Sequence, residues 1–291
     1  MALTLIAAPA CSEAKTKPIT FRELLARERA SADARIAYGP EANQFGELWL
    51  PQGRGPHPVV VLIHGGCWRA DLPGLELMDY LAADLRGRGV AVWNLEYRRI
   101  GGGGGYPATF DDVAAGVDRL KTFARARDLD LRRVVLSGHS AGGHLALWSA
   151  ARSRLPRTSP LWRADPLKVR GVVALAGIND LAAYRARGPE ACGGPGTIDA
   201  LVDAARTGDV YADTSPPRLL PLGVRQVVIS GGLDPIVPPR FGSDYAALAA
   251  GRGDRALPVE LAEAGHFELI DPTAPAWSRV RAVIGALLAD E

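Results

Sequence analysis

Short runs rich in valine, leucine and isoleucine recur along this 291-residue chain and alternate with longer stretches of helical period. The run HPVVVLIHGG at 57–66 is continuously apolar and closed by glycines, which is typical of a strand buried on both faces. Other strand-like runs lie at 32–39, 45–51, 89–98, 132–138, 169–177, 224–232 and 257–265. Helical patterns lie at 75–89, 108–129, 141–153, 243–253 and 275–290. This alternation predicts an α/β fold with a mostly parallel central sheet and helices on both faces.

One stretch interrupts the alternation. Residues 180–223 show no strand pattern, are rich in glycine, proline and alanine, and contain one expected helix at 198–206. We interpret them as a small insertion between late strands that forms a partial lid. Residues 1–17 are interpreted as a flexible N-terminal segment, and 18–291 as one α/β domain, which is a reasonable size for a single domain of this class.

Composition removes several classes of function. The formal net charge is only +2, so nothing favours a nucleic-acid partner. No apolar run approaches the roughly 20 residues of a transmembrane helix. The three cysteines, Cys11, Cys67 and Cys192, have no metal-ligand spacing and suggest no disulfide framework. We therefore expect no metal and no cofactor, and the oligomeric state is not predicted.

The N-terminus leaves the compartment open. Residues 2–11 have a short apolar core followed by Ala8-Pro9-Ala10, in outline the end of a signal peptide, but no basic region precedes them. If they are a truncated signal or lipoprotein segment, with Cys11 as the lipid-modified residue, the protein is exported or periplasmic. If they are an ordinary tail, it is cytoplasmic.

The stretch RRVVLSGHSAGGHLALW, 132–148, places Ser140 between an expected strand and an expected helix. In a G-x-S-x-G turn the glycines permit a bend too tight for a Cβ, and the bend lifts the serine hydroxyl above the sheet edge. The backbone N–H of Ala141 points at the same space from the start of the helix. Ser140 is therefore the candidate nucleophile, against the simpler reading of an ordinary loop serine.

A serine hydroxyl needs a base and an orienting carboxylate. His266 follows the last expected strand and Asp234 the strand before it, so both come at the carboxyl edge of the sheet, where such sites gather. The order serine, aspartate, histidine is the one expected for this kind of sheet. The other histidines are His57, His64, His139 and His144, of which His144 is expected to pack and hydrogen-bond on its helix and His139 to face away from the hydroxyl. Glu268 and Asp271 compete for the carboxylate role.

The stretch LIHGGCWR, 62–69, ends the first buried strand with small residues that let backbone N–H groups approach a substrate oxygen. Together with the serine turn, this H-G-G-x-W motif makes the chain resemble the α/β-hydrolases, in particular the esterase and aryl-formamidase group, from about Arg35 to the C-terminus. The resemblance implies an α/β-hydrolase fold, in which Gly66 and Cys67 donate oxyanion N–H groups with Ala141. The cysteine is a departure at the variable position. The missing third glycine disfavours the hormone-sensitive-lipase-like branch.

These features predict a serine carboxylesterase that cleaves small-acyl esters through a covalent acyl-enzyme. An aryl formamidase acting on an amide of the N-formylkynurenine type is the alternative, and a catalytically inactive hydrolase fold used for binding is a third. The expected partner is a small-molecule ester or amide. Trp68 and Phe267 are bulky neighbours of the catalytic groups and are the tentative walls of the substrate pocket. A capping box at Thr20 and Glu23 predicts a helix from about Phe21 that drapes over the pocket mouth, and a second capping box is expected at Thr109 and Asp112.

Overall fold

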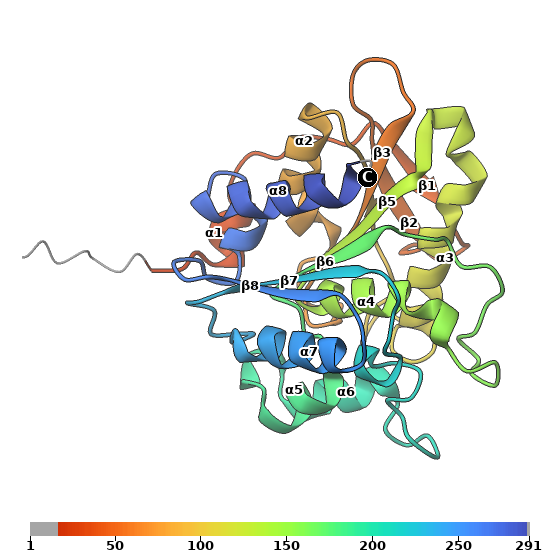
Figure 1. The fold of residues 1–291 in the computed structure, drawn as a ribbon, viewed down its shortest axis with the longest axis vertical. Coiled ribbons are helices and arrows are strands. Elements are labelled where there is room, and N and C mark those ends of the chain that lie inside the picture. Colours follow the sequence, from red (N-terminus) through yellow and green to blue (C-terminus); the bar gives the residue numbers. More distant parts are fainter. Residues whose placement is uncertain (1–16, 290–291) are drawn as a thin grey trace, which may run out of the picture.

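The computed structural model of the chain describes residues 17–289, which form an eight-stranded sheet with helices on both faces (Figure 1). The strand order is β1-β2-β4-β3-β5-β6-β7-β8. The pairs of β2 with β1 and with β4 are antiparallel, and the pairs from β4 to β8 are all parallel, so the expected mostly parallel sheet is confirmed. The strands are β1 Ala34–Ala37, β2 Phe45–Trp49, β3 His57–Ile63, β4 Ala91–Leu95, β5 Leu129–His139, β6 Gly171–Leu175, β7 Arg225–Gly231 and β8 Ala256–Leu261.

The helices form two layers. Figure 1 shows α1, α2 and α8 over one face of the sheet and α3, α4 and α7 over the other, with α5 and α6 beyond α7. Their bounds are α1 Phe21–Leu25, α2 Asp79–Gly87, α3 Ala108–Phe123, α4 Ala141–Ala150, α5 Leu181–Arg187, α6 Pro195–Val202, α7 Arg240–Gly251 and α8 Pro275–Leu288. Short 3₁₀ turns lie at η1 Leu75–Met78, η2 Arg125–Arg127, η3 Arg152–Arg154, η4 Glu190–Cys192, η5 Pro216–Arg218 and η6 Glu268–Ile270.

The run at 57–66 explains how one sheet serves two cores. Successive side chains of a strand point to opposite faces. Val59, Val61 and Ile63 pack into the layer of α3 and α4, whereas Val60 and Leu62 pack into the layer of α2 and α8. All five are fully buried. Each such side chain stabilises the fold by about 1.5–3 kcal/mol, which is why residues 58–63 contain no polar side chain.

The first expected capping box is present and the second is not. The Thr20 hydroxyl accepts from the Glu23 N–H at 3.2 Å, and the Glu23 carboxylate accepts from the Thr20 N–H at 2.7 Å, so α1 begins where expected. The prediction for Thr109 and Asp112 is wrong. Thr109 donates its hydroxyl to the carbonyl of Arg98 at 2.6 Å, and Asp112 forms an ion pair with the same residue, so a tertiary contact replaces the local cap.

The insertion at 180–223 contains two helices where one was expected. Asp180 caps α5 by accepting from the Ala183 N–H at 3.0 Å, a signal that the sequence reading missed. The expected helix at 198–206 is α6, which starts earlier because Pro195 suits a first helical turn and ends at Asp203, a left-handed residue. Among residues 17–289, no helix has the length and apolar character needed to cross a bilayer.

Candidate active site

Ser140 lies on a sharp turn between β5 and α4. Its backbone has φ 55° and ψ −119°, a conformation that non-glycine residues seldom adopt. A Cβ on Gly138 would collide with the backbone of Gly142, and a Cβ on Gly142 would collide with the carbonyl of Ile63. The two glycines thus let the turn pack against the end of β3. The Ser140 N–H donates to the Leu175 carbonyl at 2.8 Å, which ties the turn to β6.

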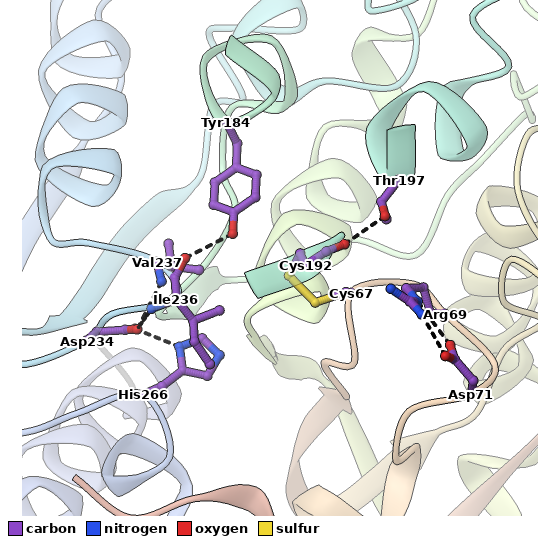
Figure 2. The surroundings of a disulfide bond; sticks show 10 residues. All are labelled: Cys67, Arg69, Asp71, Tyr184, Cys192, Thr197, Asp234, Ile236, Val237 and His266. Atoms are coloured by element: carbon purple, nitrogen blue, oxygen red, sulfur yellow. Dashed lines mark hydrogen bonds and ion pairs between the residues drawn. A yellow bond between two sulfur atoms is a disulfide. The ribbon is translucent and has the colours of Figure 1, made fainter. Parts of the chain in front are cut away.

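The structure brings the predicted base and acid together. His266 Nδ1 lies 2.6 Å from Asp234 Oδ2, and both side chains are almost fully buried. The other carboxylate oxygen of Asp234 accepts the N–H groups of Ile236 at 2.7 Å and Val237 at 2.9 Å, so the acid is fixed in one orientation (Figure 2). With Nδ1 engaged by the carboxylate, Nε2 is the ring nitrogen left for proton transfer. His266 and Ser140 line the same cavity.

The competing carboxylates have other partners. Glu268 accepts from the N–H of Ile19 at 2.6 Å, and Asp271 forms an ion pair with Arg27 at 2.7 Å. Neither role involves the imidazole of His266, which is held by Asp234.

The remaining histidines are structural or neighbouring groups. His57 starts β3, at the sheet edge opposite the serine turn, and His144 contacts the Thr214 carbonyl at 2.8 Å. Burial lowers the pKa of His144 to about 4. His139 was expected to face away from the hydroxyl, yet it lines the cavity beside Ser140, and its ring centroid is 4.4 Å from that of His266. Burial, with the charge of His266, lowers the pKa of His139 well below its usual range, so it is neutral.

The loop after β3 is the predicted oxyanion loop, and it has an unusual backbone. Gly66, Cys67 and Trp68 all have positive φ, at 93°, 49° and 56°. The preceding Gly65 has no room for a side chain, since a Cβ there would lie 3.1 Å from both the His139 ring and the Ser140 Cβ. Gly66 and Cys67 line the cavity with Ser140. Ala141 begins α4, where N–H groups lack a partner within the helix.

A buried polar network holds this loop in place. His64 Nδ1 is 2.8 Å from the Gly65 carbonyl and Nε2 is 3.0 Å from Glu96 Oε1, so both ring nitrogens have a partner. Burial raises the pKa of Glu96, but the charges of His64 and Arg99 and the hydrogen bonds outweigh it and hold that pKa at about 2. Arg99 also donates to the carbonyls of Leu72 at 2.7 Å and Pro73 at 3.3 Å.

The cavity above Ser140 is small and apolar. Its volume is about 110 Å³, below the roughly 300–1,000 Å³ of pockets that enclose drug-sized ligands. Besides the groups already named, its walls are Phe21, Leu72, Pro73, Leu77, Ala191, Ile236 and Phe267. A wider hollow of about 690 Å³ lies at the other edge of the sheet, beside the starts of β6 and β7, and its lining includes no serine, threonine, cysteine or histidine.

Of the two pocket residues predicted from the sequence, the structure places only one in the cavity wall. Phe267 lines the cavity, but Trp68 does not. Trp68 is fully buried in the core, with its ring edge-on to His144 at a centroid distance of 5.4 Å. Cys67 and Trp68 both have a left-handed backbone, which turns the chain at this point. Residue type does not predict such a backbone at two consecutive non-glycine residues.

The expectation of no disulfide is wrong. Cys67 and Cys192 form a disulfide bond that ties the oxyanion loop to η4 of the insertion (Figure 2). From α5, the first helix of the insertion, the Tyr184 hydroxyl donates to the Ile236 carbonyl at 2.9 Å, beside the acid. Burial, with the charge of Asp234, raises the pKa of this tyrosine. The insertion therefore contacts the site at both the oxyanion loop and the acid turn.

Sequence reasoning missed several residues that shape the site. The buried charge of Glu96 at the end of an apolar strand was an available signal, because such charges are rarely buried without a partner. The wall residues Leu72, Leu77 and Ile236 carried no signal, because ordinary apolar residues in loops do not reveal which cavity they face. Among the residues that the structure describes, no group of three or more His, Cys, Asp or Glu side chains is arranged to hold a metal.

Comparisons with known proteins show which family the chain resembles in sequence. The BD-FAE family matches residues 47–244, more than half of the chain. Carboxylesterase NlhH of Mycobacterium tuberculosis is 36% identical over 110 residues, which is 38% of this chain and only about a third (33%) of the relative's length. The kynurenine formamidase-like hydrolase fscH of Fusarium equiseti is 26% identical, over 69% of this chain and 75% of that protein.

Solved structures show the same fold. Esterase B of Lactobacillus rhamnosis superposes with a TM-score of 0.74 at 18% identity, covering 91% of this chain and 90% of that one. Esterase LipW of Mycobacterium marinum gives a TM-score of 0.69 at 23% identity, covering 93% and 86%. The expected α/β-hydrolase fold is thereby confirmed, and the chain belongs to the BD-FAE family.

Proposed function

We propose that the protein is a serine carboxylesterase. The observation that carries the proposal is the meeting of three features in one cavity: Ser140 on its strained turn, the His266–Asp234 pair at 2.6 Å, and a loop of positive-φ residues beside them. A surface serine used only in a binding fold would not need a buried imidazole and an oriented carboxylate. These features are the parts that an acyl-transfer site requires.

The geometry supports a two-step reaction. His266 Nε2 takes the proton of the Ser140 hydroxyl as Oγ bonds to the ester carbonyl carbon, and Asp234 stabilises the imidazolium that results. The oxyanion is held by the backbone N–H groups of Gly66, Cys67 and Ala141. When the tetrahedral intermediate collapses, the carbon–oxygen bond to the alcohol breaks and the alcohol leaves with the proton from the imidazole. Water then repeats the sequence on the acyl-enzyme and releases the acid.

The acyl group that this site accepts is small. A cavity of about 110 Å³ holds little more than a short alkyl chain beside the reacting carbonyl. One methylene too many in such a pocket costs about 1–3 kcal/mol. We expect kcat/KM for p-nitrophenyl acetate or butyrate to exceed that for the decanoate by at least about tenfold, measured below the micelle range. A rate that rises through C10 and C12 would contradict the small-acyl assignment.

Esters and formamides are separated by one comparison. The 26% identity to a kynurenine formamidase-like hydrolase keeps aryl-formamide hydrolysis as the second candidate. Rates on the short ester series and on N-formylkynurenine, measured side by side with wild type and Ser140→Ala, decide between them. We expect the esters to be preferred and Ser140→Ala to lose about 10³-fold or more in kcat on either substrate. A kcat/KM higher on N-formylkynurenine than on every ester would assign the formamidase activity.

We also propose that the protein works in an oxidising compartment, periplasmic or extracellular. The Cys67–Cys192 disulfide supports this, because such bonds persist mainly where thiols are not kept reduced. The segment at 2–11, including the possible lipid-modified Cys11, lies outside the described residues. Fractionation of cells that express the full chain tests the proposal, with the protein expected outside the cytoplasm.

A further inference from the structure

One wall of the cavity comes from the N-terminal helix. Phe21, the first residue of α1, lines the cavity together with Phe267, the residue after the base. The two rings meet edge to face with their centroids 6.1 Å apart, a favoured arrangement for aromatic pairs. The ring of Phe267 in turn lies 4.9 Å from that of His266. Phe21 therefore reaches the reacting groups through a single intervening ring.

The helix is held firmly against the core. Leu24 is fully buried in the layer that contains Leu77, itself a wall of the cavity. The hydroxyl of Tyr80, on α2, lies 2.8 Å from the Leu24 carbonyl and 3.2 Å from the Arg27 carbonyl. The capping box at Thr20 fixes the first turn. Five residues of helix have little stability alone, so these contacts are what hold α1 in place.

The same segment is also fastened to the loop that carries the base. The Ile19 N–H donates to the Glu268 carboxylate at 2.6 Å, and Arg27 pairs with Asp271 at 2.7 Å. An exposed ion pair by itself adds little. Here it acts with a charge-assisted backbone hydrogen bond and an aromatic contact on the same loop. The segment at 19–27 is thus a fixed wall of the cavity, fastened to the loop that carries His266.

We propose that Phe21 sets the upper size limit of the acyl group. Phe21 is partly exposed and also lines the cavity, so it is a wall residue that lies near the surface. Leu77, by contrast, is buried in the core, and its removal would leave an internal void rather than an opening. Truncation at Phe21 widens the cavity on its solvent side and gives a longer chain a path outward. The inference rests on the proposed esterase function.

The test is a chain-length profile of p-nitrophenyl esters from acetate to decanoate, for wild type, Phe21→Ala, Phe21→Trp and Leu25→Ala. Leu25 is the matched control, because it is a partly buried residue on the same helix that does not line the cavity. In Phe21→Ala the ratio of kcat/KM for decanoate to that for butyrate should rise at least about tenfold, as expected when several methylenes regain room. In Phe21→Trp the ratio should fall, and in Leu25→Ala it should stay at the wild-type value.

An unchanged ratio in both Phe21 variants would overturn the inference. So would an equal rise in Leu25→Ala, which would mean that any loosening of α1 opens the site. A companion series of acetates with alcohols of increasing length separates the two sides of the ester, and a response confined to that series would also overturn the acyl assignment. If wild type cleaves none of the esters and its Ser140 does not react with a phosphonate, the proposed function itself fails.

Discussion

The disulfide between Cys67 and Cys192 makes a prediction of definite size. The substitution Cys192→Ser removes a cross-link between residues 125 positions apart in the sequence. Chain-entropy reasoning predicts that a cross-link closing a loop of that length contributes about 5 kcal/mol to the free energy of unfolding. Removing a native disulfide typically lowers that free energy by about 2–5 kcal/mol. The unfolding entropy of a chain of this length is about 0.6 kcal/mol per kelvin, so the melting temperature should fall by roughly 3–8 °C.

The assay combines thiol counting with thermal unfolding. In a Cys11→Ser background, the oxidised protein should show no titratable thiol in denaturant and two after reduction. Melting is then followed with and without dithiothreitol. Reductant should lower the melting temperature of the parent, once the disulfide is shown to be reduced, and leave Cys192→Ser unchanged, since that variant has no bond to break. Two free thiols in the oxidised parent, or a variant that melts within about 1 °C of it, would refute the reasoning.

Three further predictions concern two buried carboxylates near the site and the absence of a metal requirement. Burial, with the charge of Glu47, raises the pKa of Asp79 from 3.8 to about 7. Ionisation of this carboxyl therefore lowers the free energy of unfolding as the pH rises from about 4 to 7, by at most about 4 kcal/mol. Asp79→Asn should have a higher melting temperature than wild type at pH 8, and this gain should vanish below pH 4. Glu96, with its lowered pKa of about 2, stabilises the fold above its ordinary value of 4.5 and less as the pH falls toward 2. Glu96→Leu should cost about 3–5 kcal/mol in denaturant unfolding, because His64 and Arg99 lose a buried partner, and a variant as stable as wild type would show that the network is dispensable. EDTA should leave ester hydrolysis unchanged, whereas activity lost to EDTA and restored by Zn²⁺ would reveal a missed metal.

The parts of the site that were predictable are those encoded locally. The glycines around Ser140 and the apolar run that ends before His64 each specify a strand and the turn that follows it. Because parallel strands end at one edge, residues after β5, β7 and β8 could be placed together without knowing any distance. The chain order of Ser140, Asp234 and His266 then suggested the pairing of Asp234 with His266, which the structure has at 2.6 Å beside a cavity that Ser140 also lines.

The parts that escaped prediction depend on contacts between distant segments. Pairing of Cys67 with Cys192 requires knowing how the insertion folds back over the sheet edge, and spacing alone does not contain that. The burial of Trp68 follows from positive φ at two consecutive non-glycine residues, which residue type argues against. Thr109 and Asp112 matched a capping pattern, but the Thr109 hydroxyl donates to the Arg98 carbonyl and Asp112 pairs with the Arg98 side chain instead. In each case a tertiary contact outweighed the local signal.

The central claim is that Ser140, activated by His266, is the nucleophile. It is tested most directly by treating the protein with an alkyl fluorophosphonate and locating the adduct by mass spectrometry while residual esterase activity is followed. We expect one adduct per chain, on Ser140, with esterase activity lost in proportion to labelling. Labelling of His266→Ala should be much slower. An adduct on another residue with Ser140 unmodified, or full activity in protein labelled at Ser140, would contradict it.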